Sequence, residues 1–167
     1  MPKRFLYLLS SLSFALSASA QTPSQQVTVD AYLKLTFPGR VNRSDNNVSI
    51  FLNSTVNHTT YYLLRMKVRQ EISETQLGEF MNELARRKMA DQQYDGLTKQ
   101  MTDSVVGGAK GPFVKMKRPD QTKPLFDYMF ITIRGANIYL LMSSSSKPEA
   151  NALEDARHFF EKVIFKA

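Results

Sequence analysis

The stretch VVGGAKGPFVKMKRP, which runs from Val105 to Pro119, sets three glycines among four basic residues. Such a composition suggests a phosphate-binding loop, in which glycine N–H groups hold the phosphate oxygens. That loop needs the spacing G-x-x-x-x-G-K-[ST] between a strand and a helix. The glycines in this chain have a different spacing, and no Ser or Thr follows a Gly-Lys pair. We therefore interpret them as the end of one element and the start of the next.

Metal chemistry has few candidate ligands, because the chain has two histidines and no cysteine. His58 falls in a predicted hairpin turn, and His158 lies on the polar side of a predicted helix. The loop that begins at Asp45 partly follows the calcium-loop pattern, but Ile50 replaces the required glycine and Val56 the bidentate glutamate. Because a metal site needs several converging ligands, we expect no metal and no cofactor.

Acid, base and nucleophile patterns are also weak in this sequence. No G-x-S-x-G turn is present to expose a serine nucleophile. The four serines 143–146 are interpreted as the end of a strand and the cap of a helix. Glu79 and Glu83 lie on the polar side of a predicted helix, where paired carboxylates are ordinary surface residues. The sequence predicts no catalytic residue and no enzyme.

The basic residues offer the remaining chemistry. Arg65, Lys67 and Arg69 alternate along one predicted strand, and Lys115 and Lys117 along another, so each set shares a strand face. If the two strands were neighbours, these five residues would form one patch for an anionic polymer or lipid headgroups. The alternative is a set of separate solvated charges. We do not expect nucleic acid as a partner, because no binding motif for it is recognised.

The residues between those cations define the opposite face of the first strand. Leu64, Met66 and Val68 are expected to turn toward the core. The cationic face would then be open, at least at Lys67 and Arg69.

Strands are predicted where apolar and polar residues alternate or where apolar runs end in turn residues. They lie at residues 33–37, 48–52, 61–69 and 113–118, and within the segments PLFDYMFITIRG and IYLLM. The last two are apolar on both faces, which is typical of central strands, and Gly135 lies in the turn between them.

Two well-marked helices are predicted from their capping patterns. Ser73 and Gln76 begin the first, and Ser146 and Glu149 begin the second, each as a capping box. The second helix is expected to bury a stripe of six residues: Ala152, Leu153, Ala156, Phe159, Phe160 and Val163.

A shorter helix is predicted between them. Leu97, Met101 and Val105 recur at every fourth residue, and Gly107 stands where a helix often ends in a left-handed residue.

The order of these elements predicts an α+β fold. Strands joined by short turns favour a largely antiparallel sheet, with helices packed on its faces. We expect a single domain at residues 32–167. Its core is expected to combine five large side chains: Phe126, Phe130, Leu140, Phe159 and Phe160.

The first residues have the pattern of a secretory signal peptide. Lys3 and Arg4 precede an apolar run from Phe5 to Leu16, and the small-residue site 18–20 predicts cleavage after Ala20. The alternative is a membrane anchor, but the run is shorter than the ~20 residues that a spanning helix needs. Residues 21–31 are expected to be a flexible lead-in.

Charge and cysteine content bear on the surroundings of the protein. Loss of Lys3 and Arg4 lowers the formal charge from +7 to +5, which still favours anionic partners. The absence of cysteine excludes disulfides and favours a bacterial periplasmic or secreted protein. In a eukaryote four Asn-x-Ser/Thr sites would be glycosylation candidates, but we interpret them as polar turn residues: Asn42, Asn47, Asn53 and Asn57.

Three short motifs resemble the PsbP-like superfamily of small exported proteins. They are TFPGRV near the start, NIYLLMSSSS, and FFEKVIF at the end, in order between Leu33 and Phe165. The resemblance implies an antiparallel sheet between helices, and a non-catalytic role in protein binding or assembly. No functional residue carries over from it.

Two functions therefore stay open. One is a non-catalytic domain that binds an unknown protein partner in the bacterial envelope. The other is a binder of an anionic ligand, polymer or membrane surface through the basic strand face.

Overall fold

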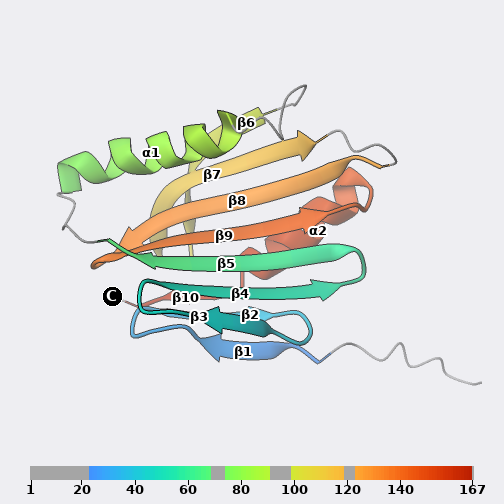
Figure 1. The fold of residues 1–167 in the computed structure, drawn as a ribbon. Helices are drawn as coiled ribbons and strands as arrows, with labels where there is room; N and C mark the ends of the chain where they lie inside the picture. The colour runs from blue at the N-terminus through green and yellow to red at the C-terminus, as the bar shows by residue number, and fades with distance from the viewer. Residues whose placement is uncertain (1–22, 69–73, 91–98, 119–122, 167) are drawn as a thin grey trace, which may run out of the picture.

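The computed structural model describes residues 23–68, 74–90, 99–118 and 123–166 (Figure 1). The described residues form two antiparallel sheets and two helices. The large sheet has the order β3-β4-β5-β9-β8-β7-β6 and the small sheet the order β1-β2-β10. The strands are β1 (Gln25–Thr28), β2 (Leu33–Phe37), β3 (Asn42–Asp45), β4 (Ser49–Val56), β5 (Thr59–Lys67), β6 (Lys99–Val106), β7 (Ala109–Arg118), β8 (Leu125–Arg134), β9 (Asn137–Ser145) and β10 (Val163–Phe165), and the helices are α1 (Glu74–Ala90) and α2 (Glu149–Phe160).

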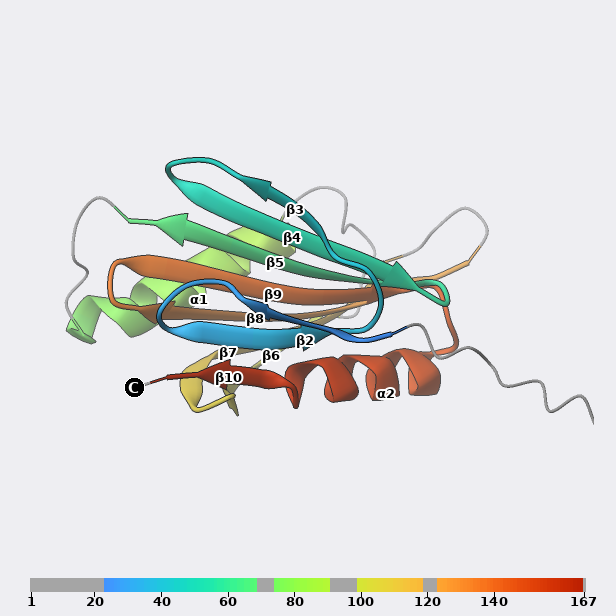
Figure 2. The same ribbon diagram turned by 90° about the horizontal axis from the view of Figure 1, so that it is seen from below.

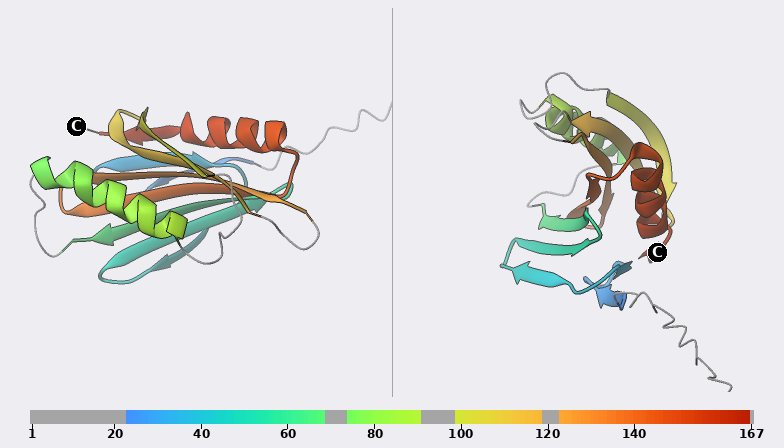
Figure 3. Two further views of the ribbon diagram at one scale, coloured as in Figure 1. Left: turned by 90° about the horizontal axis from the view of Figure 1, so that it is seen from above. Right: turned by 90° about the vertical axis from the view of Figure 1, so that its right-hand side faces the viewer.

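The elements form layers on the two faces of the large sheet. Helix α1 packs on one face, over β7 and β8. Helix α2 and the small sheet lie on the other face, as the views along and across the sheet show (Figures 2 and 3). The predicted α+β fold, with a largely antiparallel sheet and helices on its faces, is confirmed.

The larger core lies between the large sheet, α2 and the small sheet. Phe126, Phe130, Phe159 and Phe160 all belong to it, as predicted. Leu140 does not, so that part of the prediction is wrong. Successive residues of a strand point to opposite faces, and β9 turns Tyr139 and Leu141 toward this core. Leu140 therefore packs in the second cluster, under α1.

The N-terminal boundary also differs from the prediction. Residues 25–28 form β1, inside the segment 21–31 that the sequence predicts as a flexible lead-in. Gln25 to Thr28 pair with Phe37 to Lys34 of β2. Most side chains of β1 are exposed, so the strand has almost no hydrophobic pattern of its own, and its order comes from the backbone ladder with β2.

The predicted short helix is wrong, because residues 99–106 form strand β6. Met101, Thr102 and Val105 pair with β7 across an antiparallel ladder. The two-residue turn between the strands is Gly107-Gly108, with φ of 57° and 86°. Gly-Gly is a common pair in hairpin turns that need two positive φ angles. Leu97 lies outside the described residues.

The N-terminal ends of the two helices test the predicted capping boxes. That of α2 is wrong: the N-cap is Pro148, and no side chain caps it. Glu149 instead extends its carboxylate to Lys115. Leu153 is 48% exposed, so it leaves the predicted buried stripe. Helix α1 is confirmed, but Ser73 of its predicted box lies outside the described residues.

Candidate interaction groove

A bend in β7 separates the tip of the β6–β7 hairpin from the rest of the large sheet. The ladder between β7 and β8 begins at Phe113, whereas Ala109 to Pro112 pair with β6. Pro112 has no N–H to donate. A side chain at Gly111 would overlap the carbonyl oxygen of Ile131. These two residues let the hairpin curl toward α2, which Figure 3 shows from the side.

The curled tip is fixed against β10. The N–H of Phe165 donates to the carbonyl oxygen of Gly107 at 2.9 Å. Gly107 has a positive φ, and a Cβ there would overlap the carbonyl oxygen of Val163. The close approach of the two backbones therefore requires glycine at this position.

Between the hairpin and α2 lies an apolar groove of about 580 Å³. We call it the α2 groove. The large apolar side chains of its walls are those of Val105, Val106, Phe113, Leu153, Phe160 and Val163. Val105 is 64% exposed and Leu153 48%, whereas Val106, Phe160 and Val163 are buried. Large apolar side chains are thus left in water directly above a packed apolar floor.

The charged residues of the α2 groove lie on α2 and directly after it. Arg157 and Glu161 form a loose pair, with 3.7 Å between Nε and Oε1 and more than half of each side chain exposed. Glu154 also lines the groove and has no ion pair among the described residues. The groove therefore carries a small negative excess, in a chain whose formal charge is +7.

A second hollow lies on the other side of β6. It has about 540 Å³, and its lining includes Met81 of α1 and Pro112 of β7. Val105 lines both hollows. Within the described chain β6 pairs with β7 alone, so it is an edge strand of the large sheet. An edge strand presents unpaired N–H and C=O groups to a partner.

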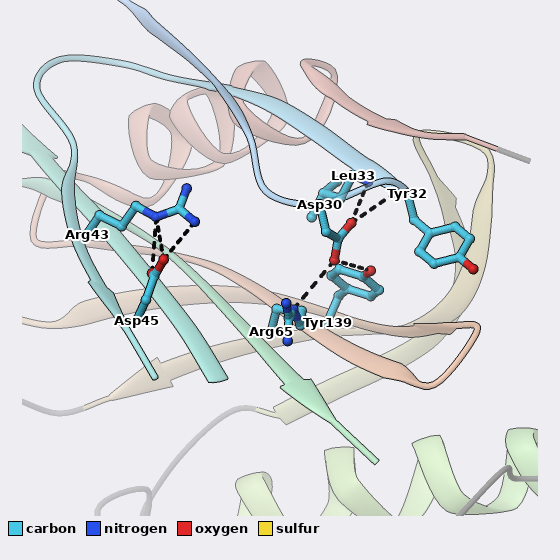
Figure 4. Close-up of polar contacts among 7 residues, drawn as sticks. All are labelled: Asp30, Tyr32, Leu33, Arg43, Asp45, Arg65 and Tyr139. Carbon is cyan, nitrogen blue, oxygen red and sulfur yellow. Dashed lines mark hydrogen bonds and ion pairs between the residues drawn. The ribbon is translucent and has the colours of Figure 1, made fainter. Parts of the chain in front are cut away.

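The predicted basic residue Arg65 does not lie on an open face. Its side chain is 12% exposed, and its Nε lies 3.5 Å from Oδ2 of Asp30. Figure 4 shows Arg65 and Tyr139 directed toward this carboxylate from β5 and β9. Arg65 shares its strand face with Leu63, which is buried in the larger core. Met66 and Val68, which the sequence predicts to turn toward the core, do pack against the second cluster. The expectation of an open face is therefore wrong at Arg65.

Asp30 links the small sheet to the large one. Its Oδ1 accepts the N–H groups of Tyr32 and Leu33 at 2.9 and 3.0 Å. Its Oδ2 accepts the hydroxyl of Tyr139 at 2.7 Å. Burial raises the pKa of Tyr139, and the hydrogen bond to Asp30 raises it further. We interpret the cluster of Asp30, Arg65 and Tyr139 as a structural clamp.

The other predicted cations do not join Arg65 in one patch. Strands β5 and β7 are separated by β9 and β8, a distance of ~14 Å at the usual strand spacing. Along the sheet, Lys115 lies level with Tyr61, four residues from Arg65. Lys115 forms an ion pair with Glu149, with 2.6 Å between Nζ and Oε1. That hydrogen bond raises the pKa of Lys115 and lowers the pKa of Glu149.

The remaining predicted contact residues are separate charges. Lys67 is exposed at the end of β5. Lys117 is exposed, with its Nζ 5.8 Å from the ring centre of Phe126. Arg69 lies outside the described residues. The condition for one patch, that the two strands are neighbours, is not met, because β9 and β8 stand between β5 and β7. Binding of an anion by any of these residues stays a prediction.

Ser145 lies in a buried polar cluster with Thr59 and Asp155. Ser145 is fully buried, with its Oγ 2.8 Å from Oγ1 of Thr59. Asp155 accepts hydrogen bonds from Thr59 at 2.7 Å and from Lys147 at 2.6 Å. Burial raises the pKa of Tyr61 beside this cluster, and Asp155 raises it further. A fully buried serine hydroxyl cannot reach a substrate.

The two histidines lie in different elements. His58 has a φ of 66° in the predicted β4–β5 turn, and His158 is exposed on α2. In the described part of the chain, no group of three or more His, Cys, Asp or Glu side chains could hold a metal ion. Among the described residues, neither helix is long and apolar enough to cross a membrane.

Comparison with known proteins identifies the fold. No family model matches the chain, and no curated protein does. Among solved structures, the cyanobacterial PsbP (CyanoP) of Synechocystis sp. PCC 6803 is similar, with a TM-score of 0.60, 7% identity, and coverage of 87% of this chain and 94% of that one. LpqN of Mycobacterium tuberculosis, described as involved in cell envelope biogenesis, has a TM-score of 0.52, 11% identity, and coverage of 87% and 91%.

A structure from Bacteroides thetaiotaomicron VPI-5482 is similar over 88% of this chain but only 49% of that one, with a TM-score of 0.53 and 11% identity. At such identities the likeness concerns the fold alone. The chain has a PsbP-like fold, as its motifs predict.

Proposed function

We propose that this chain is a non-catalytic exported protein of the bacterial envelope that holds a segment of a partner protein in the α2 groove. The observation that carries the proposal is the exposure of Val105 and Leu153 above a packed apolar floor. Contiguous apolar surface of this kind marks interaction sites in soluble domains. The charged groups lie along the α2 side of the groove, beside its apolar floor, as polar residues border the apolar centre of many protein interfaces.

The expected occupant is an extended segment with apolar side chains and a basic residue. Among the described strands β6 has a free edge, and a hollow lies on each side of it. An added strand would pair with that edge and direct alternate side chains into the two hollows. A lysine or arginine of the segment would meet Glu154, which has no ion pair among the described residues.

The cellular setting rests on the sequence and on the fold. The N-terminal pattern of residues 1–20 supports export with cleavage after Ala20. The absence of cysteine favours a bacterial periplasmic or secreted protein. The similarity to LpqN, described as involved in cell envelope biogenesis, agrees with an envelope role.

Position-specific crosslinking tests the proposal. A photoreactive residue is placed at Leu153, at Val105, or at Val48, which is a 58% exposed valine away from the groove. We expect Leu153 and Val105 to give an adduct with the same segment of one envelope protein, and Val48 to give none. A synthetic peptide of that segment then serves as the ligand for affinity measurements.

Substitutions in the groove give the quantitative result. Leu153→Asp and Val105→Asp should each weaken binding of the peptide about fivefold or more, because an apolar side chain buried on binding contributes on the order of 1 kcal/mol or more. The control Val48→Asp should leave the affinity unchanged. Adducts that do not depend on position, or equal affinity of all three variants, would contradict the proposal.

A further inference from the structure

The outer face of the small sheet has a chemical character that differs from the rest of the surface. Strand β2 buries Leu33, Leu35 and Phe37, and β10 buries Val163 and Phe165. The alternate residues of both strands therefore point away from the core. The register sets Ile164 of β10 directly opposite Lys34 of β2. Ile164 is 54% exposed, so an apolar side chain stands in water beside a lysine.

Two further lysines flank Ile164. Lys162 and Lys166 stand two residues before and after it, and both are exposed. The backbone N–H of Lys166 donates to the carbonyl oxygen of Tyr32 at 2.8 Å, which extends the β10–β2 ladder beyond Phe165. We call Lys34, Lys162, Ile164 and Lys166 the lysine face.

No carboxylate neutralises the lysine face within the described chain. None of its three lysines takes part in an ion pair there. Asp30, which precedes β2, is directed inward to Arg65 and Tyr139 (Figure 4). Glu161 pairs with Arg157 on α2. The face thus combines three lysines that form no ion pair with any described residue and one exposed aliphatic side chain.

The lysine face is also accessible. Figure 2 shows β2 and β10 on the near side of the molecule, and no described helix or strand covers them. A largely flat, open sheet face suits a small ligand poorly, because such a ligand needs a concave site. It suits an extended surface of opposite charge.

We propose that the lysine face docks on an anionic lipid membrane, with Ile164 entering the boundary between headgroups and acyl chains. Basic residues near an anionic leaflet are attracted by its surface potential. An exposed aliphatic residue among them adds apolar burial, which a soluble polyanion does not offer. The α2 groove is formed by other side chains, so this surface is independent of the proposed function.

Vesicle binding tests the proposal with a matched control. The probes are vesicles of phosphatidylcholine alone and vesicles with about 30% phosphatidylglycerol, which supply the anionic surface. The purified chain, in its exported form if a leader is removed, is compared with a triple variant: Lys34→Gln, Lys162→Gln and Lys166→Gln. The control removes three exposed lysines outside the face and the same net charge: Lys67→Gln, Lys110→Gln and Lys123→Gln.

We expect the triple variant to lose roughly fivefold in partition coefficient per lysine at low salt, on the order of 100-fold in all, on the anionic vesicles. The control should lose much less, because its lysines lie outside the face. Ile164→Ser should weaken vesicle binding about fivefold while leaving the binding of soluble heparin unchanged.

Two results would overturn the proposal. If the triple variant and the control bind anionic vesicles equally, the attraction comes from net charge alone. If the triple variant loses heparin and vesicles in parallel while Ile164→Ser has no effect on vesicles, the face is a general polyanion site and not a membrane surface. The far-ultraviolet circular dichroism of each variant checks that the fold is retained.

Discussion

Arg65 lies on the same face of β5 as Tyr61 and Leu63, both of which are buried. The alternation of this strand could not reveal that, because Leu63 and Leu64 are both apolar and either could face the core. The partner that accommodates Arg65 is Asp30, which belongs to a segment that the sequence predicts as flexible. The sequence predicts a solvent-exposed Arg65, because its counter-charge Asp30 lies 35 residues away along the chain and sequence spacing gives no sign of that contact.

The lysine face is a second case of residues that can be understood only in space. Lys34 and Ile164 are paired partners in the small sheet, although they lie at opposite ends of the sequence. Their spacing in the chain predicts nothing, whereas the alternation within each strand does predict which residues point outward. Local pattern sets the direction of a side chain, and non-local pairing sets its neighbours.

Buried tyrosines predict a loss of stability in alkali. The pKa of each of three tyrosines is raised above its ordinary value of 10.0, chiefly by burial: Tyr61, Tyr128 and Tyr139. These phenols stay protonated in the folded chain, while the unfolded chain releases their protons above pH 10. The stability that these protonated phenols give the folded chain is therefore fully present below pH 10, and it is lost as the pH rises above 10. The free energy of unfolding should fall by about 1.4 kcal/mol per pH unit for each of Tyr61 and Tyr139, whose pKa is raised the most, and Tyr128 should add to this fall.

Urea unfolding between pH 8 and pH 11 measures this slope. Tyr139→Phe should make this slope above pH 10 less steep by the contribution of one tyrosine, because one phenol that can release a proton on unfolding is removed. At neutral pH the same variant should be less stable by about 1 kcal/mol, because Asp30 loses the donated hydrogen bond. If the free energy of unfolding stays constant above pH 10, the buried phenols do not stay protonated in the folded chain, and the prediction is wrong.

At the scale of elements, β6 shows where periodicity fails. Met101 and Val105 are four residues apart, and four is close to a helical turn but is also an even number, so both residues share a strand face as well. The following Gly107-Gly108 suits either a helix end or a hairpin turn. Helix α1 was predicted correctly because its pattern is long enough to fit one period only. Strands β8 and β9 were predicted correctly because their apolar runs lie on either side of the turn at Gly135.

The glycine pair of this turn gives a matched test of the contact between the hairpin and β10. Gly107→Ala and Gly108→Ala both place a side chain at positive φ, which costs roughly 1–2 kcal/mol. At Gly107 the new Cβ would also overlap the Val163 carbonyl, whereas at Gly108 the nearest atom, the carbonyl oxygen of Phe165, is 3.8 Å away. Gly107→Ala should therefore be the less stable variant, by about 1–3 kcal/mol.

Thermal and urea unfolding of the two glycine variants check the difference. The α2 groove supplies a second reading, because Gly107 lines it and the backbone shift would move Val105 and Val106. Equal stability of the two variants would mean that the backbone of β10 moves away from the new Cβ at little cost. The contact would then not fix the hairpin tip.

For the whole molecule, the fold class follows from the order of strands and helices, and it agrees with the PsbP-like motifs. The small sheet, in which the C-terminal strand β10 pairs with the N-terminal strand β2 and so closes the fold, could not be predicted. Strand β10 has three residues and β1 four, too few for a pattern, and β10 pairs with β2 across almost the whole chain. The α2 groove depends on the same closure, together with the bend at Gly111 and Pro112. The candidate site could therefore not be predicted from the sequence, although the apolar residues that form its walls are visible there.

This closure predicts that the two ends of the chain stabilise one cooperative unit. Phe165 is buried and its ring meets Tyr139 nearly edge-on, with 5.3 Å between centroids and 78° between planes. Phe165→Ala should lower the free energy of unfolding by about 3–5 kcal/mol. The neighbouring Ile164→Ala, which faces solvent in the same strand, should change it by less than about 0.5 kcal/mol.

Hydrogen exchange distinguishes a cooperative loss from a local one. Leu33, Leu35 and Phe37 of β2 belong to the same core as Phe130 of β8 and Phe159 of α2, and Phe37 and Phe159 are in ring contact at 5.5 Å. In Phe165→Ala, the amides of β2 and β8 should therefore lose protection together, by the same free energy as the global change. Faster exchange in β2 with unchanged protection in β8 would show that the small sheet opens on its own, and that the large sheet with α2 is stable without it.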